Sequence, residues 1–397
     1  MTTHWKRVRL GDIISIKHGY AFKSEYFAAD GPYVVTTPGN FHDEGGFKFS
    51  EEKRKGYAGP IPHGYLLSKG ALLVAMTEQA EGLLGSTAII PQSNVFLHNQ
   101  RLGLINALSP RRADEKFIYY LFNTRRVRQQ IRASSSGTKV RHTSPSRIGE
   151  IEVLLPPLGE QRRVASILSA YDDLIENNTR RTEILKEVAR RIYEEWFVHF
   201  RAPGGDDLPL MESPLGPIPE GWAIARLGEV IDLKYGKALK ADHREVGPYP
   251  VYGSSGVVGT HIVPLVEGPG IVVGRKGNVG SVHWSERSFF PIDTAFYVST
   301  ERPLAYIFQL LMKQRFLNSD AAVPGLNRNQ ALSIEFVLPP VELMQDFAAL
   351  IGPINKLIFS LAEQNRNLCA QRDLLLPKLI YGEIDVSQPE ELLEAAE

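Results

Sequence analysis

The segment WKRVRLGDI at residues 5–13 is repeated in diverged form as WAIARLGEV at residues 222–230, at an offset of 217 positions. A second pair of matching segments, IEVLLPP at residues 151–157 and IEFVLPP at residues 334–340, lies 183 positions apart. A repeat of this length indicates that a whole domain is duplicated. We therefore expect two similar domains, the first longer than the second by 34 residues.

Each Pro-Pro pair is followed by a long helical pattern, at residues 160–200 and 341–376, the second interrupted at Gly352 and Pro353. The first helix would be about 60 Å long if straight. Apolar residues recur with a period of 3.5, which is typical of a coiled coil. We expect an antiparallel pair, with Pro377 ending the second helix. The seam residues are Val164, Leu168, Tyr171, Ile175, Asn178, Thr182, Leu185, Ala189, Ile192 and Trp196, then Phe347, Ile351, Ile354, Ile358, Leu361, Asn365, Leu368, Arg372, Leu375 and Leu379.

The regions between the landmarks contain short apolar runs broken by Gly, Pro and Asn, which predict strands and prominent loops. We expect strands at 71–76, 271–273, 281–284 and 295–298, and helices at 117–132 and 304–317. The predicted fold class is α+β, with two mixed α/β domains separated by two long helices in pseudo-two-fold relation. The predicted parts are a first domain at 1–157, a first spacer helix at 158–200, a linker at 201–221, a second domain at 222–340, a second spacer helix at 341–382 and an acidic tail at 383–397.

Composition excludes several classes of protein. The single cysteine, Cys369, rules out a disulfide framework and a cysteine-rich zinc site. The first eleven residues lack the apolar region of a signal peptide, and no apolar run approaches the roughly 18 residues that span a bilayer. We expect a cytoplasmic protein with no membrane contact.

The charge is distributed unevenly although its sum is zero. Residues 1–150 hold 21 basic and 12 acidic residues, whereas residues 201–337 hold 13 and 14. A basic excess permits nucleic-acid binding but more commonly marks a solvated face. Two similar, non-identical domains on a rigid spacer suit two different half-sites on DNA. They equally suit a scaffold or adaptor that binds two protein partners, and the architecture alone does not separate these interpretations.

Several segments together resemble type I restriction-modification specificity subunits. LPPLGEQRRVASIL at 155–168 and IYEEWFVHF at 192–200 resemble the first spacer helix of that family, and RDLLLPKLIYGEI at 372–384 resembles its tail. PIPEGW at 217–222 is typical of the start of its second recognition domain. Further matches are HNQR at 98–101, YPVYGSSG at 249–256 and PIDTAF at 291–296. Leu343 and Met344 depart from the pattern, since they stand where counterparts of Glu160 and Gln161 would fall.

The resemblance implies two target-recognition domains that bind double-stranded DNA. It also implies that the helices dock two methyltransferase subunits, which use S-adenosylmethionine, and that ATP-driven restriction subunits join the complex. The chain itself would be non-catalytic and would need no cofactor.

The residues also argue against catalysis. The glycines Gly274, Gly277 and Gly280 match neither a phosphate loop nor a dinucleotide fingerprint, so we expect them in tight turns. Asp293 and Glu301 lack the lysine that a nuclease site needs, because Pro303 stands in its place. No constellation of acid, base and metal ligand can be assembled.

Candidate DNA contacts are polar and basic residues in loops that follow strands or helices, because such side chains pair with base edges and phosphates. In the first domain they are Thr77, Gln79, Gln100, Arg101, Lys139, Arg141 and His142. In the second they are Lys237, Tyr252, Ser254, Ser255, Arg275, Lys276, Asn278, Asn327 and Arg328.

The aromatic residues Tyr193, Trp196 and Phe197 could anchor a partner. We favour packing within the helix pair, because aromatic residues at helical spacing are usually buried.

Overall fold

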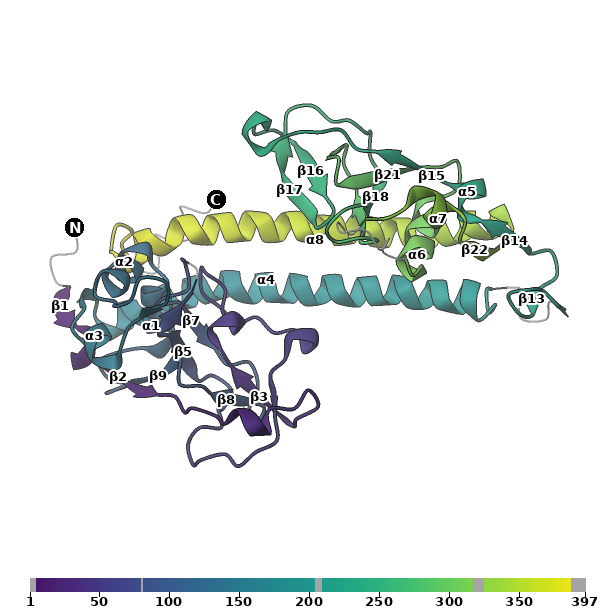
Figure 1. The fold of residues 1–397 in the computed structure, drawn as a ribbon. Helices are drawn as coiled ribbons and strands as arrows, with labels where there is room; N and C mark the ends of the chain where they lie inside the picture. The colour runs from purple at the N-terminus through teal and green to yellow at the C-terminus, as the bar shows by residue number, and fades with distance from the viewer. Residues whose placement is uncertain (1–4, 80, 204–208, 317–324, 387–397) are drawn as a thin grey trace. The chain divides into compact units, whose positions relative to one another are not determined.

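The structure is a computed structural model that describes residues 5–79, 81–203, 209–316 and 325–386. The chain forms two compact units, one of residues 1–175 with 367–397 and one of residues 176–366. Each unit contains one α/β domain and one part of a helix pair (Figure 1). We call the α/β part before the first long helix the first domain, and the α/β part between the two long helices the second domain.

The first domain is built on a four-stranded antiparallel sheet in the order β2-β9-β5-β7. A smaller sheet has the order β4-β3-β8, in which β3 and β8 are parallel. The strands are β1 (Lys6–Arg9), β2 (Ile14–His18), β3 (Tyr33–Thr36), β4 (Gly56–Tyr57), β5 (Leu72–Ala75), β6 (Thr77–Glu78), β7 (Thr87–Ile89), β8 (Phe96–His98), β9 (Leu102–Ala107), β10 (Arg141–His142) and β11 (Glu152–Leu155). β1 pairs with β11, and so closes the domain with its two ends side by side.

Three helices complete the first domain: α1 (Glu115–Phe122), α2 (Arg125–Ala133) and α3 (Pro145–Gly149). The single helix predicted at 117–132 is therefore wrong, because it is divided after Phe122. The side chain of Asn123 accepts a hydrogen bond from the Thr87 N–H at 3.1 Å, and the Thr124 hydroxyl donates to the Leu121 carbonyl at 2.7 Å. The bond to Thr87 ties the break between α1 and α2 to β7.

The second domain repeats this topology. Its main sheet has the order β15-β21-β18-β19, and its small sheet has the order β17-β16-β20, again with one parallel pair. β14 pairs with β22 as β1 pairs with β11. The elements are β12 (Leu210–Met211), β13 (Ile218–Pro219), β14 (Ala223–Arg226), α5 (Leu227–Val230), β15 (Asp232–Tyr235), β16 (Tyr249–Gly253), β17 (Gly256–His261), β18 (Gly270–Gly274), β19 (Val282–Ser285), β20 (Phe290–Pro291), β21 (Ala295–Ser299), α6 (Leu304–Lys313), α7 (Arg328–Leu332) and β22 (Glu335–Leu338).

The helix pair consists of α4 (Leu158–Tyr193) and α8 (Val341–Ile380). In the first unit, Val164 and Leu168 share a core with Leu379 and Ile380. In the second unit, Tyr193 shares a core with Phe347, and the Asn178 amide donates to the Gln364 side chain at 3.4 Å. Early residues of one helix thus meet late residues of the other in both units. The prediction of two mixed α/β domains with an antiparallel helix pair is confirmed.

None of the predicted seam residues is exposed. The prediction that Pro377 ends the second helix is wrong, however, and so is the interruption at Pro353, since α8 is continuous from Val341 to Ile380. An internal proline costs a helix about 3 kcal/mol. Leu379 and Ile380 are fully buried, and each such side chain contributes about 1.5–3 kcal/mol. Tertiary burial therefore outweighs local propensity.

Each long helix is followed, two residues after its last turn ends, by a residue in the left-handed backbone conformation. α4 continues as a π-helical turn (Glu194–Val198), and Phe200 follows with a φ of 58°. α8 is followed by Gly382 with a φ of 70°. A non-glycine residue in this region is strained, and the ring of Phe200 packs edge-on against Trp222, with 5.2 Å between the centroids.

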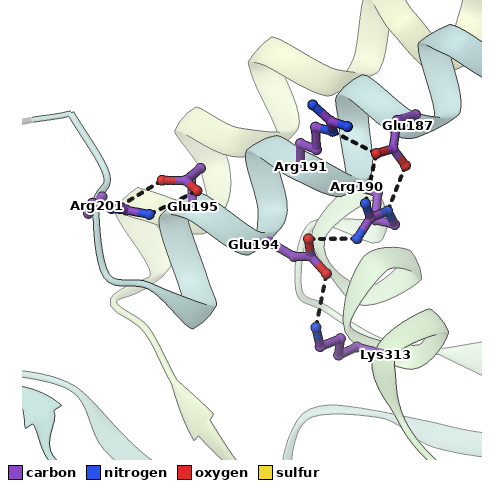
Figure 2. Close-up of polar contacts among 7 residues, drawn as sticks. All are labelled: Glu187, Arg190, Arg191, Glu194, Glu195, Arg201 and Lys313. Carbon is purple, nitrogen blue, oxygen red and sulfur yellow. Dashed lines mark hydrogen bonds and ion pairs between the residues drawn. The ribbon is translucent and has the colours of Figure 1, made fainter.

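Charged residues surround the end of α4 (Figure 2). Glu194 accepts from Arg190 at 2.6 Å and from Lys313 of α6 at 2.9 Å, and Glu195 pairs with Arg201 at 2.8 Å. Under this exposed network the aromatic residues point inward, because Tyr193 and Phe197 are buried. The favoured prediction of packing for the aromatic cluster is confirmed, with Trp196 half-buried against Phe347.

Among the described residues, none of the helices combines the length and the apolar character that a membrane span requires.

Candidate nucleic-acid interface

In the first domain, most of the predicted residues meet where the main sheet ends. β6 continues from β5 and pairs with β10, so that Thr77 lies opposite His142. The Thr77 hydroxyl is 3.2 Å from Nδ1 of His142. On the other side, the Met76 N–H donates to the Arg101 carbonyl at 3.0 Å. We define the first edge as Thr77, Gln79, Gln100, Arg101, Arg141 and His142.

The predicted residue Lys139 belongs to a loop that projects from the first edge. Ser136 and His142 exchange two backbone hydrogen bonds, at 2.9 and 2.8 Å, and so close the loop between them. Gly137 has a φ of 95°, and a β-carbon there would collide with the Val140 carbonyl. Lys139 is exposed on this loop, whereas Arg141 is half-buried and donates to the Ser135 hydroxyl at 3.3 Å. The loop therefore presents the Lys139 ammonium group on a backbone that hydrogen bonds hold in place.

In the second domain, predicted residues gather at the corresponding place. The N–H groups of Arg275 and Lys276 donate to the Thr294 carbonyl at 2.9 and 3.1 Å, and Lys276 forms a β-bridge with Gly325. The Lys237 N–H donates to the Pro291 carbonyl at 3.0 Å, in the same segment. We define the second edge as Lys237, Ser254, Ser255, Arg275, Lys276 and Asn278.

The two edges have the same backbone hydrogen bonds. Met76 bonds to Arg101 as Arg275 bonds to Thr294, and Thr143 donates to the Met76 carbonyl as Leu326 donates to that of Arg275, at 2.9 and 2.8 Å. The β-bridges make Thr77 equivalent to Lys276, and His142 equivalent to Gly325. The frame is therefore shared, while the side chains that it presents differ.

A glycine fixes each frame at one point. The Gly19 N–H donates to the Leu102 carbonyl and the Gly236 N–H to the Ala295 carbonyl, both at 3.1 Å. A β-carbon on Gly19 would collide with the carbonyl of Asn99, and one on Gly236 with that of Ile292. Only glycine allows the backbones to approach so closely.

Comparison with known proteins identifies what the two domains are. Residues 3–187 and 219–364 each match the family model of the type I restriction modification DNA specificity domain. The chain belongs to this family. A specificity subunit gives a type I restriction-modification system its DNA sequence specificity and assembles with the other subunits of the system.

Relatives of the specificity subunit match over most of the chain. The specificity subunit of the type I restriction enzyme MjaIX of Methanocaldococcus jannaschii is 23% identical and covers 81% of this chain and 79% of its own length. A putative type I specificity subunit of Mycoplasma pneumoniae is 24% identical and covers 95% of this chain and 96% of its own length. The crystal structure of the type I S subunit from M. genitalium aligns with a TM-score of 0.61 at 20% identity, covering 97% of this chain and 98% of that chain, and so shows the same fold.

Several of the predicted DNA contacts are engaged within the fold of the specificity subunit. Thr77 is buried against His142, Arg141 bonds to Ser135 as described above, and the Arg275 guanidinium donates to the Asp293 carbonyl at 2.9 Å. Tyr252 is buried and its hydroxyl donates to the Trp284 carbonyl at 3.3 Å, while burial raises the pKa of this phenol. Ser254 is also buried. Asn327 caps α7 by accepting from the Gln330 N–H at 3.2 Å, and Arg328 is ion-paired with Asp232. Contact of these residues with DNA stays a prediction.

The structure adds supporting residues that sequence reasoning missed. Glu78 is buried and its carboxylate accepts from the N–H groups of Gly82 and Leu84 at 3.2 and 2.9 Å, while Arg132 lies 3.3 Å away. The Arg128 guanidinium donates to the carbonyls of Leu84 and Asp43 at 2.9 and 2.7 Å, and burial lowers its pKa. Both side chains hold the turn that carries Gln79. Arg132, the ion-pair partner of Glu78, and both carbonyl partners of Arg128 are distant along the chain, so no local pattern points to these contacts.

Proposed function

We propose that this specificity subunit binds a bipartite, asymmetric DNA target, with one half-site contacted by each edge. The observation that carries the proposal is the shared frame with different side chains. A threonine and a histidine face each other on the first edge, where the second has a lysine and a glycine. Base recognition depends on the donors and acceptors that a protein presents, so two such edges favour two different sequences.

Eight of the exposed predicted contacts divide by chemistry. The exposed cations Arg101, Lys139, Lys237 and Lys276 suit phosphate or guanine, and the exposed Gln79, Gln100 and Asn278 suit adenine. Ser255 can bond to either kind of group. These residues lie on two edges of equal construction, which supports a role in binding for each group as a whole.

The specificity subunit would do no chemistry itself. We propose that the helix pair docks two methyltransferase subunits and that restriction subunits join them, so that the subunit supplies only the target sequence. Family membership supports assembly with other subunits, and the duplicated architecture supports two equivalent docking positions. A scaffold that never touches DNA, the alternative that the architecture left open, is not favoured by the family.

The test is binding to a randomised duplex pool, with and without a methyltransferase partner, followed by sequencing of the bound fraction. Two different short motifs at one fixed spacing are expected. Replacing residues 222–337 by those of a relative should change only one motif. Absence of any enriched motif in the presence of the partner would contradict the proposal.

A further inference from the structure

The small sheets of the two domains share a topology but carry different surface chemistry. β4 is the antiparallel edge strand in the order β4-β3-β8, as β17 is in the order β17-β16-β20. Lys53, Arg54 and Lys55 immediately precede β4. β17 instead exposes Val257 and Val258, which are 58% and 40% accessible. The edge strand of the first domain is thus flanked by cations, and that of the second is apolar.

An open groove of about 520 Å³ lies beside β4 and reaches the first edge. Gly56 allows its wall to form, because a β-carbon there would collide with the Ala28 carbonyl. Across the groove lies the loop of Gln100 and Arg101, held by a hydrogen bond of 2.9 Å from the Gln100 N–H to the Tyr20 carbonyl. The polar lining residues are Thr37, Arg54, Lys55, Asn99, Gln100 and Arg101.

The cationic side chains that line the groove differ in whether they have partners within the protein. Arg54 is fixed, since its guanidinium donates to the Gly31 carbonyl at 2.5 Å and pairs with Glu51 at 3.3 Å. Lys55 and Arg101 are exposed, and neither side chain forms an ion pair or a hydrogen bond within the described residues. Two unpaired cations on opposite sides of one groove create a positive potential that attracts an anion.

We infer that this groove binds a phosphate of the DNA backbone through Lys55 and Arg101, and so anchors the first domain on the duplex. The inference rests on the proposed function. The groove adjoins the first edge, because the Arg101 carbonyl accepts from Met76 next to Thr77. A phosphate bound there would be part of the duplex that the edge contacts.

The second domain has no equivalent arrangement among its described residues. Thr294 takes the place of Arg101, and the valines of β17 take the place of the basic segment. The charge agrees, because the basic excess of the chain lies in residues 1–150 and is absent from residues 201–337. The first domain therefore supplies the larger share of the salt-dependent affinity, and the second depends more on the edge itself.

The test is the salt dependence of binding by the full chain to a labelled duplex of random sequence. Each phosphate contact contributes a slope of about 0.9 to the fall of log K with log salt concentration. Lys55→Ala with Arg101→Ala removes this one phosphate contact and should lower the magnitude of the slope by about 0.9. The control variant Lys69→Ala with Lys116→Ala removes the same charge from exposed lysines outside the groove and should lower it much less. An unchanged slope, or an equal effect of the control, would overturn the inference.

Sequence selection separates this inference from the proposed function. The Lys55→Ala variant, whose altered residue lies outside the first edge, should enrich the same two motifs as the wild type, because phosphate contacts set position and affinity rather than sequence. A changed first motif would overturn the phosphate assignment in favour of base contact. If the wild type enriches no motif, the proposed function fails, and the salt slopes on random DNA still decide whether the groove binds phosphate.

Discussion

The two domains are attached to the helix pair by different chemistry, although they share a fold. In the first unit, the Tyr120 hydroxyl donates to Asp172 of α4 at 2.6 Å, and Asp172 accepts from Arg372 of α8 at 2.7 Å. In the second unit, the equivalent helix α6 contributes Tyr306, whose ring lies 4.9 Å from that of Phe197. Phe197 also contacts Phe347 of α8, with 5.2 Å between the centroids. Both junctions contain an apolar core, to which the first adds a polar network and the second an aromatic cluster.

The difference predicts how each junction fails. A polar network depends on every partner, because removing one leaves the others desolvated and unpaired. An aromatic cluster depends on how fully its side chains fill the available volume. It therefore tolerates a substitution that changes side-chain shape better than one that leaves a cavity. Hydrogen exchange followed separately for α1 and α6 can compare the junctions, because each helix reports on its own unit.

The largest expected effect is that of Phe197→Ala. The side chain is buried among other rings, and truncation of such a residue costs about 3–5 kcal/mol. Exchange protection of α6 should fall, while that of α1 should stay near the wild-type value. Leu350→Ala is the control, since Leu350 lies on α8 in the same unit and is 46% exposed. Equal loss of protection in α1 and α6 would contradict independent junctions.

The second-largest effect is expected from a fall in pH. It should destabilise the first unit more than the second, because His98 of the first domain has no titrating counterpart in the second. His98 is fully buried, and desolvation lowers its pKa to about 4 from an ordinary value of 6.5. Below pH 6.5 the unfolded chain therefore binds a proton that the folded chain does not, so the stability of the first unit falls as the pH falls from 6.5 to 4. The loss reaches about 3 kcal/mol. At the equivalent position the second domain has Pro291.

Exchange protection at pH 5 and pH 7 measures this difference. His98→Gln keeps a donor for the Leu102 carbonyl, which His98 contacts at 3.0 Å, and should remove most of the pH dependence of the first unit. If the protection of the first unit in this variant still falls between pH 7 and pH 5 as in the wild type, another group causes the pH dependence.

Asp172→Ala should have a smaller effect, restricted to the first unit. It removes the acceptor of Tyr120 and the ion-pair partner of Arg372, at a cost of about 1–3 kcal/mol. Asp172→Asn keeps an acceptor for the phenol but not the charge, and should lie between the wild type and Asp172→Ala. Protection of α1 measured in all three proteins gives this order. If Asp172→Asn behaves as the wild type, the charge contributes nothing.

The smallest effect is expected for Glu194→Gln in the second unit. Glu194 joins Arg190 and Lys313 in the exposed network of Figure 2, and the hydrogen bond from Lys313 lowers the pKa of its carboxyl. Exposed ion pairs contribute about 0–1 kcal/mol. The exchange protection of α6 should therefore change by less than about 1 kcal/mol, and by even less at high salt, which screens the charges. A loss as large as that of Phe197→Ala would show that charge, and not aromatic packing, holds this junction.

Sequence reasoning predicted the architecture because duplication is visible without knowledge of contacts. The repeated segments give the two domains, and the 3.5-residue period gives the helix seam from Val164 to Leu379. It failed where distant partners override a local signal. Pro377 is a helix breaker by itself, yet the burial of Leu379 and Ile380 carries α8 past it.

The candidate site was predicted only in part, for the same reason. Loop position and residue type selected Thr77, His142 and Lys276, which lie on the two edges. These criteria cannot distinguish an exposed cation from one engaged within the fold, and so Arg328, which pairs with Asp232, was selected equally. Lys55 was missed because its groove exists only once β4, the loop at Gln100 and the backbone at Ala28 come together.

The close approaches at Gly19 and Gly236 also bear on protein engineering. Since any side chain at either position would collide with a neighbouring carbonyl, a saturation library should lose nearly all variants at these two codons, whichever DNA sequence is used for selection. The two glycines thus mark equivalent starting points for grafts. A chimaera whose junctions lie at such matched positions would transfer an edge together with the backbone that supports it.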